Sequence, residues 1–272
     1  MGLVSPLTMK AKLLLRRTHA GSKGWDEELP VDIKGAWGEL VSELDEAGTL
    51  FFPRSTVPPR KEVGEPLLVG FGDGSLEGFM ALVYAVWPLE GGGAEVYPIL
   101  AKARVSPLGG TTTPRMEMSS AALLGRLTVL VARNAGFKPA EVVLGLDSEC
   151  TVAALQRRGG TLKPYFAHRA AEVEDALVEL RQQAIQGEEN PADIGTRGRA
   201  TVLDLSPTSR YQRGPDFLQR PREEWSFKSG NCDNSSVGEG RQAHVVSCYF
   251  STMLVNSIPG GEASSNLAVL PF

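Results

Sequence analysis

The sequence has no long hydrophobic run and no excess of positive charge, and both absences exclude classes of function. No apolar run reaches the roughly 18 residues that a membrane-spanning helix needs, so we expect no contact with a membrane. The formal net charge of the 272 residues is −4, so no overall positive field indicates a nucleic-acid partner. A nucleic acid would therefore have to be bound through a local basic patch or through metal ions.

Cysteine is also scarce. The three cysteines are Cys150, Cys232 and Cys248, and no two of them form a C-x-x-C pair. Cys232, His244 and Cys248 have the spacing of no standard zinc site. We therefore expect reduced thiols and a cytoplasmic location.

The chain before residue 67 is predicted to be helical and then irregular. Ile33, Trp37, Leu40 and Leu44 recur at the spacing of one helix face, and we assign residues 1–52 to a helical segment. Residues 53–66 contain four prolines among charged residues, a composition that is typical of a linker.

The central part of the chain has the pattern of an α/β fold. Apolar runs at 67–71, 78–87 and 95–105 are separated by short Gly-rich turns, which favours three antiparallel strands. A helix is predicted from Pro114 to a stop at Gly136, followed by an apolar strand at 141–146. Two further helices are predicted, through Leu155 and from Pro164. Residues 201–272 lose this periodicity, and we expect an irregular, partly disordered tail.

Four carboxylates stand at the ends of these elements. Asp73 follows the first strand between two glycines, Asp147 follows the strand at 141–146, Glu117 lies in the first turn of the long helix, and Asp193 follows Asn190-Pro191-Ala192. Because ligands gather at the carboxyl ends of neighbouring parallel strands, we expect the strands that end at Asp73 and Asp147 to lie side by side. Clustered carboxylates repel one another unless cations bind them, and oxygen ligands without His or Cys suit two Mg²⁺ ions, with Mn²⁺ as a substitute.

Each of these residues also has an ordinary structural interpretation. Asp73 can be a turn residue, and Glu117 can complement the helix dipole. Asp147 can belong to a strand-to-helix turn that Ser148 caps, and Asp193 can be part of a plain helix cap.

The combination of motifs resembles a known family. The matching stretches are F-G-D-G-S (71–75), A-K-A-R-V-S-P-L (101–108), T-P-R-M-E-M (113–118), L-D-S (146–148), Y-F-A-H-R-A-A-E-V (165–173) and G-E-E-N-P-A-D-I-G-T-R-G (187–198). Together they are similar to the ribonuclease H-like domain of BEL/Pao LTR retrotransposon pol polyproteins, here at residues 67–200. Residues 1–52 resemble the end of the reverse transcriptase region that precedes this domain.

The resemblance implies a ribonuclease H-like fold, with a mixed five-stranded sheet whose first three strands are antiparallel and which helices flank. It implies that Asp73, Glu117, Asp147 and Asp193 bind two metal ions and hydrolyse the RNA strand of an RNA–DNA hybrid. The implied partners are that hybrid and the reverse transcriptase of the same polyprotein, in a cytoplasmic virus-like particle. The chain has no polymerase, protease or integrase motif, so we expect a polyprotein fragment or a host-encoded copy.

One departure from the family pattern leaves a second function open. The family places a histidine and a proline shortly before the N-P-A-D turn, where this chain has Ala184 and Gln186. The alternative is a catalytically impaired remnant that keeps the fold as a nucleic-acid-binding or connector module.

A local basic stretch is the candidate nucleic-acid contact. It lies beside Tyr165 and Phe166, and Lys102 and Arg104 on a strand are a weaker candidate. A solvated helix face is the alternative interpretation of the stretch. Its residues are Arg157, Arg158, Lys163, His168 and Arg169.

Overall fold

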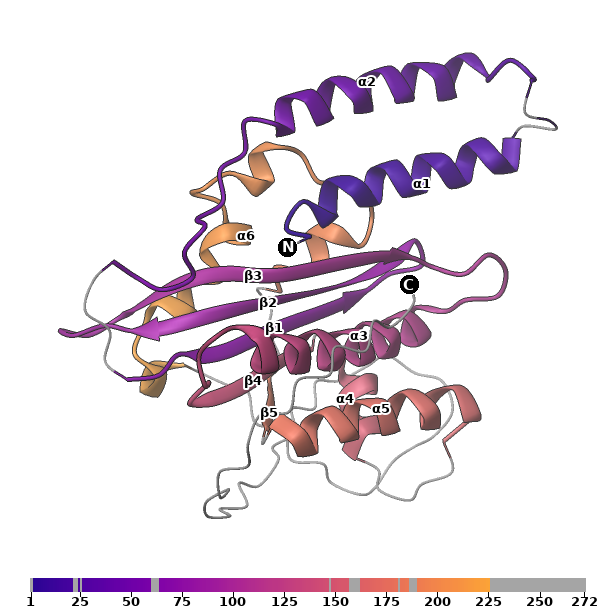
Figure 1. Cartoon of the computed structure of the whole chain (residues 1–272). Helices are drawn as coiled ribbons and strands as arrows, with labels where there is room; N and C mark the ends of the chain where they lie inside the picture. Colours follow the sequence, from indigo (N-terminus) through magenta and orange to yellow (C-terminus); the bar gives the residue numbers. More distant parts are fainter. Residues whose placement is uncertain are drawn as a thin grey trace, which may run out of the picture.

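The computed structural model describes residues 2–21, 24, 26–59, 64–146, 148–156, 162–180, 182–185 and 190–225. In these ranges a mixed sheet lies between two layers of helices and turns (Figure 1). The helices are α1 (Ser5–Gly21), α2 (Val31–Ala47), α3 (Thr113–Asn134), α4 (Glu149–Gln156), α5 (Pro164–Leu180) and α6 (Arg210–Arg213), with short 3₁₀ turns η1 (Asp193–Gly195), η2 (Leu203–Leu205), η3 (Asp216–Gln219) and η4 (Arg222–Glu224). None of the described helices combines the length and the apolar character that crossing a membrane requires.

The sheet has the order β3-β2-β1-β4-β5. Its strands are β1 (Leu67–Gly74), β2 (Gly78–Pro88), β3 (Ala94–Val105), β4 (Glu141–Leu146) and the short β5 (Gln182–Ile185). β1, β2 and β3 are antiparallel, as predicted from their short turns, whereas β4 runs parallel to β1 and β5 parallel to β4. The predicted mixed α/β arrangement is therefore confirmed, including the position of β4 beside β1. No sequence pattern had located β5, which has only four residues.

The sheet is buried on both faces because a separate hydrophobic core packs on each. One core joins Val69, Phe71 and Tyr84 to α1 and to residues after Asn190. The other core joins Leu68 and Val83 to α3, α4 and α5. Every residue of β1 is buried, which explains why its sequence is a continuous apolar run and not an alternating one.

The predicted N-terminal helices form and pack on the sheet. α1 lies along β3, where the Ser5 hydroxyl donates to the carbonyl oxygen of Ala101 at 3.2 Å. α2 packs against α1 through Ile33 and Leu40, two residues of the predicted apolar face. Figure 1 shows the two helices as a hairpin above the edge of the sheet.

Residues 201–225 are more ordered than the sequence predicted. They form short helical turns, and they bury Leu205, Tyr211 and Leu218 in the first core. The Tyr84 hydroxyl donates to the carbonyl oxygen of Tyr211 at 2.8 Å, and burial raises the pKa of Tyr84 well above its ordinary value. The tail predicted from residue 201 therefore begins with short turns that pack on the first core. Residues 226–272 lie outside the described ranges, and the proposed domain limits at residues 52, 66 and 200 stay predictions.

Candidate active site

Asp73 is the last residue but one of β1 and is 9% exposed. The residue pairs with Met80 of β2, so both side chains lie on the same face of the sheet. The flanking residues Gly72 and Gly74 lie on the opposite face, beneath α3. A strand this deeply buried places the Asp73 carboxylate at a rigid position, since its backbone is held by neighbours on both sides.

Glycine at position 74 allows α3 to approach the end of β1. A Cβ atom on Gly74 would lie 2.4 Å from the backbone nitrogen of Glu117 and 2.4 Å from the carbonyl carbon of Met116. Such distances are not possible for a real side chain, so only glycine permits this contact. The first turns of α3, with the half-buried Glu117, therefore lie directly against the residue that follows Asp73.

Ser148 connects the end of β4 to Glu117. The Ser148 hydroxyl donates to Glu117 Oε2 at 2.5 Å, and the Ser148 Oγ atom accepts a hydrogen bond from the backbone nitrogen of Thr151 at 3.2 Å. The predicted cap of α4 by Ser148 is thus confirmed, while its bond to Glu117 was not predicted. Asp147 itself lies outside the described residues. Its predecessor Leu146 pairs with Gly72, one residue before Asp73.

The Asn190–Thr196 turn is attached to the same end of β1. Asn190 Nδ2 donates to the carbonyl oxygen of Gly72 at 2.9 Å, and the Ser75 hydroxyl donates to the carbonyl oxygen of Thr196 at 3.0 Å. Gly195 packs on Met80, because a Cβ atom there would lie 1.9 Å from the Met80 sulfur. The turn therefore packs on the face of the sheet that also carries Asp73.

Asp193 is the most accessible of the described candidate carboxylates. It begins the 3₁₀ turn η1, its side chain is 54% exposed, and it forms an ion pair with Arg197 at 3.2 Å. The Asn190 Oδ1 atom accepts from the backbone nitrogen of Ala192 at 3.0 Å, while the residue at the cap position of η1 is Ala192 and not the predicted Asn190. An exposed ion pair of this kind contributes little to stability and can rearrange.

The donor set fits a hard divalent cation, although the described residues alone do not complete a site. Asp73, Glu117 and Asp193 offer only carboxylate oxygens, the ligands that Mg²⁺ and Mn²⁺ prefer. Among the described residues, no three His, Cys, Asp or Glu side chains are grouped so that they could hold a metal ion. Convergence of all four carboxylates, Asp147 included, stays a prediction.

The predicted basic contact is partly neutralised by an acidic residue. His168 Nδ1 and Arg169 Nη1 lie 3.2 Å and 2.8 Å from Glu172 Oε1, and Arg126 reaches the other oxygen of Glu172 at 3.3 Å. Lys163 is exposed just before α5. Arg157 and Arg158 lie outside the described residues, so the nucleic-acid role of the stretch stays a prediction.

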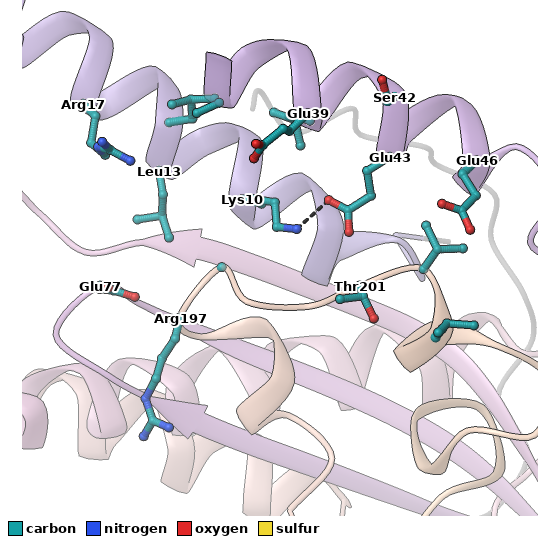
Figure 2. A pocket seen from close by; sticks show the side chains of 16 residues that line it. Lys10, Leu13, Arg17, Glu39, Ser42, Glu43, Glu46, Glu77, Arg197 and Thr201 are labelled. Atoms are coloured by element: carbon teal, nitrogen blue, oxygen red, sulfur yellow. Dashed lines mark hydrogen bonds and ion pairs between the residues drawn. The ribbon is translucent and has the colours of Figure 1, made fainter. Parts of the chain in front are cut away.

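A cavity of about 800 Å³ lies between α1, α2 and the segment from Arg197 to Leu203 (Figure 2). The ion pair between Lys10 Nζ and Glu43 Oε2, at 2.5 Å, lies at its wall. Of the described candidate carboxylates, Asp73, Glu117 and Asp193, none lines this cavity, although Arg197, the partner of Asp193, does.

Replacing Ser148 by alanine is expected to lower the free energy of unfolding by about 1 kcal/mol, because α4 loses its N-terminal cap. Glu117 loses a hydrogen-bond donor in the same change. Urea denaturation of the two proteins measures the difference. Ser148→Thr keeps the hydroxyl and should retain most of the stability, and an equal loss in both variants would exclude the hydroxyl as the cause.

Comparison with known proteins relates this geometry to a family. The family described as "Pao retrotransposon-like RNaseH-like domain" matches residues 1–148, which is more than half of the chain. The matched part includes Asp73, Glu117 and the strand β4. Among curated proteins, no sequence matches this chain.

Several solved structures are similar at low identity. RNase H1 from the archaeon Halobacterium salinarum NRC-1 is 17% identical over 45% of this chain and 84% of its own, with a TM-score of 0.29. LC11-RNase H1, solved in complex with an RNA/DNA hybrid, is 18% identical over 52% of this chain and 100% of its own, with a TM-score of 0.33. Thermus thermophilus RuvC is 13% identical over 56% of this chain and 87% of its own, with a TM-score of 0.27. Scores this low do not by themselves establish a common fold.

Proposed function

Because this chain belongs to the family of Pao retrotransposon-like RNaseH-like domains, we propose that it is a metal-dependent endonuclease that hydrolyses the RNA strand of RNA–DNA hybrids. The observation that supports the proposal most directly is local. The start of α3, with Glu117, and the turn that carries Asp193 are both attached to the end of β1, where Asp73 lies. Three segments far apart in the sequence thus meet at the end of the central strand β1.

In this proposal the cations are held by four carboxylates. Asp73 and Glu117 would supply ligands from a strand and a helix, and Asp147 and Asp193 would complete the set. When bound, two divalent cations neutralise the phosphodiester and activate a water for in-line attack.

The three described carboxylates differ in how firmly the surrounding structure holds them. Asp73 is fixed by the buried strand, and the hydroxyl of Ser148 restrains one oxygen of Glu117. Asp193 stands on an exposed turn and can exchange Arg197 for another partner. Asp73 and Glu117 would therefore position the reacting phosphate, while Asp193 would adjust as the product leaves.

We further propose that the chain derives from a retrotransposon pol polyprotein. Residues 67–200 would form the ribonuclease H-like domain, and α1 and α2 would be the end of the reverse transcriptase region that precedes it. The family match supports this, since it extends over residues 1–66 as well as the first four strands. Assembly with the reverse transcriptase in a cytoplasmic virus-like particle is part of the same proposal.

Incubation of the full chain with an end-labelled RNA–DNA hybrid tests the function. We expect RNA-strand cleavage with Mg²⁺ or Mn²⁺, none with EDTA, and none on the DNA strand or on a DNA duplex. Hybrid binding without cleavage at high protein concentration would instead support the impaired remnant, which Ala184 and Gln186 in place of the family's histidine and proline favour.

A further inference from the structure

The lysine and arginine side chains of α1 lie on two sides of the helix. Lys10 and Arg17 face α2, where they form ion pairs with Glu43 and Asp32 at 2.5 Å and 3.5 Å. Figure 2 shows both side chains beside the cavity between the two helices. These positive charges are balanced by carboxylates.

The other two cations of α1 face the edge of the sheet. Lys12 Nζ donates to the carbonyl oxygen of Ala103 at 2.9 Å. Arg16 Nη1, one helical turn later, donates to the carbonyl oxygen and the hydroxyl of Ser106, at 3.1 Å each. In the described part of the chain neither residue forms an ion pair, so both keep an uncompensated positive charge.

Strand β3 adds two more cations at the same place. Lys102 and Arg104 flank Ala103 in sequence, and both are exposed on this edge strand. The pKa of Lys12 is lowered, first by partial burial and then by the nearby charges of Lys102 and Arg104. Lys12, Lys102 and Arg104 thus lie close together, and Arg16 is bound to Ser106, two residues after Arg104. None of the four has a paired carboxylate among the described residues. Such a cluster attracts an anion, because an anion would relieve the mutual repulsion.

The strand register relates this cluster to the candidate active site. Gly74 of β1 pairs with Phe79 of β2, and Phe79 pairs with Arg104 of β3, so the three residues lie in one row on one face. That face also carries α3, whose Glu117 lies against Gly74. Two strand spacings separate Arg104 from Gly74, which is about 10 Å. Arg104 therefore lies at the same end of the sheet as Gly74 and Glu117.

Glu77, in the turn between β1 and β2, is an exposed carboxylate close to one end of the cluster, because its carbonyl oxygen accepts from the backbone nitrogen of Ser106 at 2.9 Å. No ion pair joins Glu77 to a cation of the cluster in the described part of the chain. Asp193 is paired with Arg197, and Asp32 and Glu43 are paired with the other two cations of α1. From residue 101 to residue 105 the edge strand β3 carries two cations and no carboxylate, whereas Glu95 lies at the other end of the strand.

We propose that Lys12, Arg16, Lys102 and Arg104 form a phosphate-binding track that holds the backbone of a nucleic-acid strand beside the active site. The proposal rests on the proposed function, because the strand is taken to be part of the RNA–DNA hybrid. From Lys102 to Ser106 the track covers about 13 Å of strand, enough for more than one phosphate. Because α1 supplies half of the track, the N-terminal segment has a direct part in binding the substrate.

Salt-dependent binding tests the track without any cleavage. The full chain in EDTA is titrated against a fluorescent RNA–DNA hybrid at several KCl concentrations. For the double variant Lys102→Gln/Arg104→Gln we expect roughly tenfold weaker binding, and a slope of log Kd against log salt smaller by about 2. Lys102→Arg/Arg104→Lys keeps both charges and should keep the slope of the wild type.

A matched control separates the track from a general loss of charge. Arg17→Gln/Lys34→Gln removes the same two charges from exposed ion pairs and should leave the slope unchanged. The track would be overturned by an equal decrease of the salt slope in both double variants, or by no decrease in Lys102→Gln/Arg104→Gln. It would also be overturned if the wild type did not bind the hybrid. A wild type that binds with the expected slope but never cuts with Mg²⁺ would refute the nuclease and leave the track standing.

Discussion

Asp73→Asn is expected to abolish the metal-dependent cleavage of an RNA–DNA hybrid and to leave the fold intact. The carboxylate is held by a buried strand, so no neighbouring group can move to replace the lost charge. Loss of a metal ligand should remove about 4 kcal/mol of transition-state stabilisation, which is roughly a thousand-fold in rate. Single-turnover cleavage at saturating Mg²⁺ measures this, and a melting curve checks that the variant is folded.

Two other Asp→Asn variants serve as a comparison and a control for Asp73→Asn. Asp193→Asn should retain part of the activity, because Asp193 lies on an exposed turn and already shares its charge with Arg197. Asp216→Asn changes an exposed residue of η3 and should cleave at the wild-type rate. If Asp73→Asn kept more than about a tenth of the activity, Asp73 would be a structural turn residue and not a metal ligand.

Gly74→Ala is expected to destabilise the protein by about 3 kcal/mol and to abolish cleavage together with the loss of stability. The new Cβ atom would lie 2.4 Å from backbone atoms of Met116 and Glu117, and a helix backbone cannot yield as a flexible side chain can. The start of α3 must then move away from β1 and carry Glu117 with it. Urea denaturation gives the change in unfolding free energy, and cleavage at a temperature where the variant is folded gives the effect on the site.

A Gly→Ala substitution within α2 should change the free energy of unfolding in the opposite direction. Gly38 lies within α2, and a Cβ atom there would meet nothing within 4 Å. Gly38→Ala should therefore stabilise the protein by about 0.5–1 kcal/mol, since alanine loses less conformational freedom in a helix than glycine. An unchanged free energy of unfolding in Gly74→Ala would show that α3 does not approach β1 as closely as the structure has it.

Local pattern alone was enough to locate the strands and the long helix. β1, β2 and β4 are buried on both faces, so each appears as a continuous apolar run with no need of tertiary information. Proline at 114 and glycine at 136 mark the ends of α3 because the first cannot donate a backbone hydrogen bond and the second adopts a positive φ of 78°. The four candidate carboxylates could be named for the same reason, because they stand where strands and helices begin or end.

Contacts between distant segments could not be read from these patterns. Ser148 is a helix cap in the sequence, but its bond to Glu117 depends on α3 crossing the sheet beside β4. The burial of Tyr211 and Leu218 was missed because turns of three or four residues are too short to show a helical period.

The sequence by itself thus determined the first four strands, the long helices, the mixed sheet and the acidic residues at the ends of these elements, because each depends on neighbours within a few positions. Only the tertiary structure decided which side chains meet. Gly74 accommodates the backbone of α3, Asn190 reaches Gly72 across 118 positions, and Lys12 of α1 donates to the carbonyl oxygen of Ala103 in β3. These contacts follow from the packing of α1, α3 and the Asn190 turn on the sheet, which depends on burial summed over the whole core and not on any local pattern.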